Sequence, residues 1–171
     1  THSKIEPEDD SQWIFLPAIK RVKRISSSNR TGKFVSSEFS YEDLGSEEVN
    51  DNEHIWLKDM PCPTVQNLTC AQVESRPKNA RSGYSKRISY TDLDEYRIQK
   101  IEFYNRRGDL EKILIFDNYK QYLNKYWRAH NMVMENVQTG KSTSLSWGEY
   151  SFRNGFKEND FSPQALEKAS R

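Results

Sequence analysis

The sequence predicts a mainly β protein built around an antiparallel sheet. From residue 84 onward, segments rich in aromatic and β-branched residues alternate with short turn sequences, a pattern typical of consecutive strands. Two of these turns, RRGD at 106–109 and QTGK at 138–141, contain the glycine that a tight hairpin favours. The 171 residues are 35% hydrophobic and 12% aromatic, which fits a single folded domain with one core.

The first two predicted strands lie near the N-terminus. The sequences QWIFL at 12–16 and RVKRI at 21–25 fit strands joined by a turn at 17–18. The isoleucine and valine residues within 19–25 also fit one face of a short helix. Periodicity alone does not choose between the two interpretations.

A short helical turn and two further strands are expected next. In SYEDLG, Ser40 lies three residues before Asp43, which is the spacing of a capping box, and Gly45 is an expected helix stop. Downstream, NEHIWL at 52–57 and LTCAQVES at 68–75 have the composition of strands.

The only two cysteines, Cys62 and Cys70, lie in the segment PCPTVQNLTC. A disulfide between them would constrain the unfolded chain by about 2–3 kcal/mol and would indicate a secreted or periplasmic location. Two unpaired thiols in a cytosolic protein are the alternative. A metal site needs more ligands than this pair and His54 supply.

The C-terminal half contains most of the predicted strands. These strands occupy 84–92, 96–105, 110–119, 125–137 and 142–152, with a break at 118–124. At the end of the chain, Ser162 is placed as an N-cap and Pro163 as the first helical residue, so we expect a short C-terminal helix.

The sequence lacks the signatures of several catalytic sites. It has no GxSxG, HExxH or dinucleotide-binding glycine pattern. TGKST at 139–143 is similar to the end of a phosphate-binding loop, but Glu135 stands where that loop needs glycine, so a hairpin turn at Gly140 is expected instead. His130 is interpreted as a hydrogen-bonded structural residue. We therefore expect no catalytic residue, cofactor or metal site, and a protein that is not an enzyme.

A dense basic run, Lys20, Arg21, Lys23 and Arg24, follows the apolar residues 13–16. The net charge is only +1, because acidic stretches such as 6–10 and 42–51 balance the run. Aromatic residues precede the cations rather than alternating with them, so we expect no nucleic-acid binding. The run could be a solvated strand face, or a positive rim that meets acidic head groups or an acidic partner protein in a salt-sensitive manner.

Several predicted strands are apolar on both faces. In the strand at 125–137, Met132 and Met134 share one face while Trp127 and Val133 share the other. Such a sheet needs a cover on each side, which can be another protein layer or a ligand. Ordinary packing on both sides explains the pattern as well as a ligand does.

Taken together, these segments resemble the LolA-like outer-membrane lipoprotein-sorting proteins of Gram-negative bacteria. The resemblance covers nearly the whole chain and is closest to a periplasmic branch with the motif W-x-x-L-P-A-x-K-x-V-x-R-I, found here from Trp13 to Ile25. It implies a curved antiparallel sheet that forms an open half-barrel, with a few short helices as lid or cover. The two segments at 12–16 and 21–25 would be neighbouring strands of that sheet.

The resemblance also implies a function, namely a periplasmic carrier or chaperone that binds acyl chains of lipids or lipoproteins in an apolar cavity and delivers them toward the outer membrane. The residues that we expect to line this cavity are Trp13, Phe15, Ile101, Phe103, Ile113, Ile115, Met132, Met134, Leu145 and Trp147. Each of them also fits an ordinary core position.

The expected partners follow from the same resemblance. They are an inner-membrane exporter or an outer-membrane acceptor protein, and Lys20, Arg21, Lys23 and Arg24 are the expected contacts to a partner or to head groups. Family members carry more strands and a helix before the motif, so we expect residues 1–171 to be one LolA-like domain without its N-terminal strands and helix. The sheet edge exposed in this way would favour a homodimer. The alternative function is a non-catalytic structural or interaction module of a cell-envelope export complex.

Overall fold

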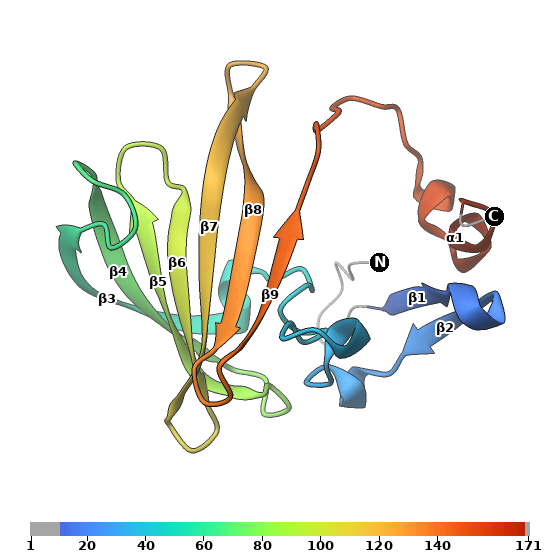
Figure 1. Ribbon diagram of the computed structural model, residues 1–171, viewed down its shortest axis with the longest axis horizontal. Helices are drawn as coiled ribbons and strands as arrows, with labels where there is room; N and C mark the ends of the chain where they lie inside the picture. Colours follow the sequence, from blue (N-terminus) through green and yellow to red (C-terminus); the bar gives the residue numbers. More distant parts are fainter. Residues whose placement is uncertain (1–10, 170–171) are drawn as a thin grey trace.

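A computed structural model describes residues 11–169 of the protein. The acidic stretch at 6–10 lies outside the described residues. The described part is organised as a large antiparallel sheet and a smaller unit made of a hairpin and a helix (Figure 1).

The large sheet has seven strands, and each strand pairs with the next one along the chain. Its strands are β3 (Asn52–Pro61), β4 (Thr69–Pro77), β5 (Tyr84–Asp92), β6 (Ile98–Asn105), β7 (Leu110–Tyr122), β8 (Tyr126–Asn136) and β9 (Lys141–Ser146). The pairing β3-β4-β5-β6-β7-β8-β9 is antiparallel throughout, and the sheet does not close on itself. The predicted mainly β, antiparallel fold class is therefore confirmed.

A separate two-stranded sheet is formed by β1 (Gln12–Leu16) and β2 (Arg21–Ile25). The prediction of two strands rather than a helix is correct, but their expected place within the main sheet is wrong. The turn between them is the 3-10 helix η1 (Pro17–Ile19), followed by Lys20 in the left-handed region at φ 50°. Proline at the start of η1 fits because its fixed φ favours a helical turn.

Helix α1 (Pro163–Ala169) packs against this hairpin and follows the 3-10 helix η5 (Glu158–Phe161) (Figure 1). The backbone N–H of Ala165 donates to the Ser162 hydroxyl oxygen at 3.2 Å. The predicted N-cap at Ser162, with Pro163 as the first helical residue, is thus confirmed. Residues 147–157, here called the C-terminal connection, link β9 to this unit.

The two faces of the large sheet differ in what covers them. Cross-strand pairs such as Ile101 with Leu114 and Leu114 with Met134 define the inner face, which also carries Phe103 and Leu145. Pairs such as Glu102 with Ile113 and Ile115 with Val133 define the outer face. Directly paired residues of antiparallel strands lie on the same face, so these assignments follow from the register.

The covering segment, residues 26–51 between β2 and β3, packs on the inner face. It holds three 3-10 helices, η2 (Ser27–Asn29), η3 (Phe34–Ser36) and η4 (Val49–Asp51). Its Phe39 is fully buried in the main core with Tyr84, Phe103, Leu114 and Met134. The rings of Tyr84 and Phe103 lie 4.9 Å apart, within the range of favourable aromatic contacts.

A buried polar network anchors the covering segment to the sheet. The Tyr84 hydroxyl donates to Asp43 Oδ1 at 2.7 Å, and Lys112 Nζ lies 3.4 Å from Asp43 Oδ2 and 3.1 Å from the Tyr84 hydroxyl. Asp43 is oriented by the capping box predicted at Ser40, whose backbone N–H donates to Asp43 Oδ2 at 2.7 Å. The expected helical turn at this place is a hydrogen-bonded turn without an α-helix.

Several strand ends differ from the sequence-based expectation; β3, for example, runs to Pro61 rather than ending at residue 57, and two further differences concern β7 and β9. The break expected at 118–124 is shorter in the structure, because β7 continues through Asn118 at φ 53° to Tyr122 and only a turn at 123–125 separates it from β8. Asparagine tolerates this left-handed conformation better than most residues, so the strand passes through it without ending. At the other place, β9 ends at Ser146 rather than continuing to residue 152.

The outer face carries paired charges between tyrosines. Glu74 is buried and accepts hydrogen bonds from Lys86 Nζ at 3.0 Å and from Arg76 Nε at 2.7 Å. The hydrogen bond from Lys86 is the main cause that lowers the pKa of Glu74, and it outweighs the opposing effect of burial. The ionised carboxylate is therefore part of the folded structure.

Because of this lowered pKa, the free energy of unfolding depends on pH. The stabilisation by ionised Glu74 is complete above the ordinary glutamate pKa of 4.5 and is lost as the pH falls through the lower pKa of the folded state. Glu74→Gln should therefore lower the free energy of unfolding at neutral pH and make its decline below pH 4.5 less steep. Urea titrations at a series of pH values measure both effects. Exposed Glu53→Gln is the control, and an equal change in that variant would count against the assignment to Glu74.

Among residues 11–169, no helix has the length and apolar character that crossing a bilayer requires.

Candidate functional site

A band of half-buried apolar side chains lies on the inner face beside the buried main core. The apolar band consists of Ile101, Phe116, Met132 and Leu145, contributed by β6, β7, β8 and β9. These residues pack against the main core but keep part of their surface in solvent, whereas Met134 beside them is 0% exposed. The band is therefore apolar surface that the described chain leaves partly open.

Trp147 extends the band past the end of β9. Its backbone N–H donates to the His130 carbonyl at 2.9 Å, so the antiparallel pairing with β8 continues to this residue. Trp147 lies two residues after Leu145 and thus on the same face. The indole is 38% exposed, which is high for so large an apolar side chain.

An aromatic cluster holds the C-terminal connection at the end of the sheet next to the band. Phe152 stacks on Tyr126 with ring centroids 5.2 Å apart, and Tyr150 packs edge-on against Tyr122 at 5.7 Å. The Tyr150 hydroxyl also donates to the Ala129 carbonyl at 3.1 Å. These contacts fix the connection over the β7–β8 end of the sheet.

His130 is buried within this cluster, and both of its ring nitrogens have partners. Nδ1 lies 3.0 Å from the Trp147 carbonyl, which can only accept, so we assign a proton to Nδ1. Nε2 lies 2.7 Å from the Tyr122 hydroxyl, which in turn lies 3.1 Å from Glu149 Oε2. Hydrogen bonds from Lys120 and then from Tyr122 lower the pKa of Glu149. This arrangement matches the structural role predicted for His130.

Removing the Tyr122 hydroxyl should loosen the C-terminal connection. Tyr122→Phe deprives His130 and Glu149 of their shared partner while the ring contacts to Phe152 remain. We expect faster amide hydrogen exchange at 147–152 and a loss of roughly 1 kcal/mol in the free energy of unfolding. Tyr126→Phe, which keeps its stacking on the same Phe152 ring, is the control. Similar exchange in the two variants would contradict this role.

Two of the expected cavity residues, Ile113 and Ile115, point away from the apolar band. Ile115 pairs with Val133 and Ile113 pairs with Glu135, so both isoleucines lie on the outer face. Phe103 and Met134 lie on the inner face but are buried beneath Phe39 and the rest of the main core. The structure therefore does not bring all ten expected residues onto one surface.

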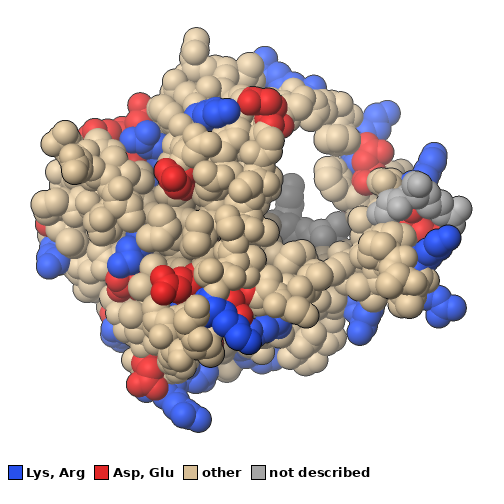
Figure 2. Space-filling model, viewed as in Figure 1, with Lys and Arg blue, Asp and Glu red and all other residues tan. Residues whose placement is uncertain are grey.

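Trp13 and Phe15 belong to the hairpin rather than to the large sheet. Trp13 pairs with Arg24, and Phe15 pairs with Val22, so these four side chains share one face of the hairpin. An opening separates the hairpin and α1 from the large sheet, and the C-terminal connection passes along its border (Figure 2). Both aromatic side chains are half-buried.

The basic residues Lys20, Arg21, Lys23 and Arg24 are all exposed on the hairpin. Lys and Arg side chains project from the end of the molecule formed by the hairpin and α1 (Figure 2). Their position is thus remote from the apolar band, which lies on the large sheet.

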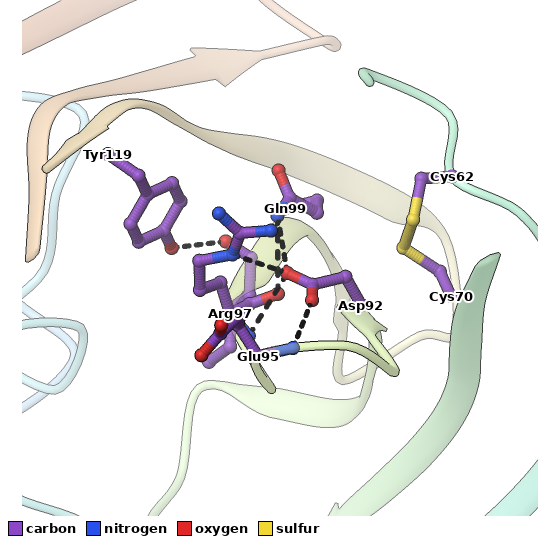
Figure 3. The surroundings of a disulfide bond; sticks show 8 residues. Cys62, Cys70, Asp92, Glu95, Arg97, Gln99 and Tyr119 are labelled. Atoms are coloured by element: carbon purple, nitrogen blue, oxygen red, sulfur yellow. Dashed lines mark hydrogen bonds and ion pairs between the residues drawn. A yellow bond between two sulfur atoms is a disulfide. The ribbon is translucent and has the colours of Figure 1, made fainter. Parts of the chain in front are cut away.

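The structure joins Cys62 and Cys70 in a disulfide beside a buried carboxylate (Figure 3). Asp92 accepts hydrogen bonds from Arg97 Nε and Gln99 Nε2, each at 2.9 Å, and from the Glu95 backbone N–H at 2.8 Å. Burial raises the pKa of Asp92, but these hydrogen bonds outweigh it and the net pKa is lowered. An ionised, fully bonded aspartate of this kind stabilises the β5–β6 turn.

Some residues of the apolar band and of the main core were not predicted from the sequence. Sequence reasoning missed Phe116 of the band, although it lies in the same predicted strand as Ile113 and Ile115. It also missed Phe39 and Asp43, for which the Ser40 capping box gave only the local turn. Within residues 11–169, no group of three or more His, Cys, Asp or Glu residues could hold a metal ion.

Comparisons with known proteins bear on both the family and the fold. A family model described as "Uncharacterized protein" matches residues 1–168, and no curated protein matches the chain. A solved structure described as a "putative outer membrane lipoprotein-sorting protein domain" from Vibrio parahaemolyticus is 48% identical, with a TM-score of 0.87 over 94% of this chain and 67% of that one.

Two further solved structures extend the comparison. A DUF1329 family protein from Desulfovibrio piger is 25% identical, with a TM-score of 0.84 over 94% of this chain and 66% of that one. A LolA superfamily protein from Nitrosomonas europaea is 18% identical, with a TM-score of 0.69 over 91% of this chain and 68% of that one, and shows the fold alone. The chain thus spans about two thirds of each of these structures, and it belongs to the family of outer membrane lipoprotein-sorting protein domains with a LolA-like fold.

Proposed function

We propose that the protein is a non-catalytic carrier that binds acyl chains of lipids or lipoproteins on the apolar band and delivers them toward the outer membrane. The observation that carries this proposal is a partly open apolar surface next to the fully buried core cluster of the same face. A protein that needed the inner face only as a core would gain by covering this band as well. The lipoprotein-sorting description of the relative at 48% identity supports the same role.

The partial exposure of the band suits a carrier that must release its cargo. Complete burial of a chain of about sixteen carbons would contribute on the order of 12 kcal/mol, at about 0.8 kcal/mol per CH₂. Such binding would be too tight for rapid transfer to an acceptor. Side chains that already pack on the core offer only their exposed parts, so a bound chain would be buried on one side and held less tightly.

Other parts of the protein would complete the site. Trp13 and Phe15 share one face of the hairpin, and the hairpin lies across the opening from the large sheet (Figure 2). In a full half-barrel, these side chains and Trp147 would border the same apolar cavity. The Cys62–Cys70 disulfide supports a periplasmic location, because disulfides persist in oxidising compartments. An inner-membrane exporter and an outer-membrane acceptor protein would then be the partners.

Displacement of a fluorescent fatty acid tests this proposal with a matched pair of variants. Met132→Gln adds a polar group to the band, whereas Ile115→Gln adds the same group to the outer face. We expect weaker binding in the first variant, by roughly ten-fold for the loss of one well-packed apolar contact, and little change in the second. Equal losses, or no binding by the parent protein, would overturn the proposal.

The second candidate is a structural or interaction module of an envelope export complex. It is favoured by the full burial of Met134 and Phe39, which shows that the protein's own side chains fill much of the inner face. Native mass spectrometry of protein purified from a Gram-negative host separates the two functions. Co-purifying lipid supports the carrier, and a consistently empty protein supports the module.

A further inference from the structure

We propose that the tip of the β1–β2 hairpin docks the protein onto an anionic phospholipid bilayer, with Ile19 inserted among the head groups and the neighbouring cations bound to them. This inference goes beyond the carrier function and does not depend on it, because the hairpin tip is separate from the apolar band.

The hairpin tip presents an apolar side chain at an exposed turn. Residues 17–20 are all exposed, and Ile19 is 59% exposed. The turn is closed by the backbone hydrogen bond from Lys20 to the Pro17 carbonyl at 3.2 Å. Proline fixes the backbone on one side of Ile19, and the left-handed Lys20 reverses the chain on the other. The turn therefore holds Ile19 outward without any need for a partner to order it.

The cations near the tip lie on both faces of the hairpin. Arg21 pairs with Leu16 and Lys23 with Ile14, which places both cations on one face. Arg24 lies on the opposite face, where its guanidinium is 5.9 Å from the Trp13 ring centroid. Lys20 belongs to the turn itself.

This distribution favours a bilayer over a protein as the partner. A protein that docked against one face of the hairpin would leave the charges of the other face without complementary partners. Head groups surround an inserted tip on all sides and can therefore contact both faces at once. Residues 11–37 contain no Asp or Glu, and the acidic stretch at 6–10 precedes the hairpin in the sequence. In α1, Glu167 and Lys168 contribute charges of opposite sign.

The expected strength of docking follows from the number of cations. Each Lys or Arg close to an anionic membrane surface improves binding by roughly five-fold at physiological ionic strength. The four cations of the tip together would raise the partition coefficient by several hundred-fold. The attraction should weaken as salt is added, whereas the contribution of Ile19 should persist.

Co-sedimentation of the full chain with vesicles tests the proposal. Vesicles of phosphatidylglycerol and phosphatidylethanolamine should bind the protein, and vesicles of phosphatidylcholine alone should not. Lys20→Gln/Lys23→Gln, which leaves Arg24 and its contact with Trp13 intact, should lower the partition coefficient by roughly twenty-five-fold. Ile19→Ser should lower it several-fold, and this loss should remain at high salt.

Matched controls lie elsewhere on the surface. Lys58→Gln/Lys141→Gln removes the same number of exposed cations from the large sheet, and Val49→Ser removes a side chain that is 77% exposed in the covering segment. Both should bind vesicles like the parent protein. Equal losses in these controls, or an Ile19→Ser variant that binds normally, would overturn insertion of the tip.

The same samples separate this proposal from the carrier function. The hairpin variants should bind a fluorescent fatty acid with the same affinity as the parent protein, because the apolar band is unchanged. Loss of vesicle binding with intact fatty-acid binding supports the docking proposal alone. If the protein does not bind anionic vesicles but binds acidic proteins through the same cations, the docking proposal is overturned in favour of a protein partner.

Discussion

Phe39→Ala should lower the free energy of unfolding by about 3–5 kcal/mol, the usual cost of truncating a fully buried phenylalanine. Phe39 is 0% exposed and touches the core residues of the inner face, so its removal leaves a cavity between the covering segment and the sheet. The backbone N–H of Phe34 donates to the Phe39 carbonyl at 2.7 Å, which holds the segment in a narrow loop. Collapse of this loop into the cavity is therefore restricted. Urea denaturation followed by tryptophan fluorescence measures the loss.

The control for this prediction is Val49→Ala in the same covering segment. Val49 is 77% exposed, so its truncation removes little buried surface and should change the stability by less than about 0.5 kcal/mol. A small loss in Phe39→Ala, similar to that in the control, would show that the covering segment is not firmly packed on the inner face. In that case the buried part of the face would also be open to a ligand.

Lys112→Met should cost a similar amount, about 3–5 kcal/mol, for an electrostatic reason. Its ammonium group lies 3.4 Å from the buried carboxylate of Asp43, and both side chains are largely removed from water. Methionine fills the space but leaves the Asp43 charge without its cation, and an uncompensated buried charge is strongly destabilising. Chemical denaturation at neutral pH measures the loss.

A double-mutant cycle with Asp43→Asn tests the cause. If Lys112→Met is destabilising because it leaves the buried Asp43 charge without its cation, the double variant Lys112→Met/Asp43→Asn should lose less unfolding free energy than the sum of the losses in the two single variants. If the losses in unfolding free energy of the two single variants simply add, Lys112 of the sheet and Asp43 of the covering segment do not interact. Lys120→Met, at a more exposed ion pair with Glu149, is the matched control and should have little effect on stability.

Local elements of the fold could be predicted well from the sequence. The strands at 12–16 and 84–92 are predicted with the bounds that the structure shows, because alternation and flanking turn residues mark them. The N-cap at Ser162 could be predicted from the sequence equally well, because capping depends on residues only three positions apart. The end of β7 could not be predicted, because an Asn118 in the left-handed conformation inside a strand has the same sequence signature as a turn.

The candidate site was harder to predict because it depends on contacts between distant segments. Alternation within a strand showed that Met132 and Met134 share one face, but it could not relate them to Ile113 and Ile115. That relation depends on the register between β7 and β8, and a shift of one residue would reverse it. Asp43 and Lys112 are 69 residues apart, so no local pattern could reveal that their contact anchors the cover.

The most direct test of acyl-chain binding on the apolar band is paramagnetic broadening of methyl signals by a spin-labelled fatty acid. The protein would carry labelled Ile, Leu and Met methyl groups and would be titrated with stearic acid that bears a nitroxide near its methyl end. We predict that the signals of Met132 and Leu145 broaden while those of Ile113 and Ile115, on the opposite face, stay sharp. Equal broadening on both faces, or none on the band, would contradict this account.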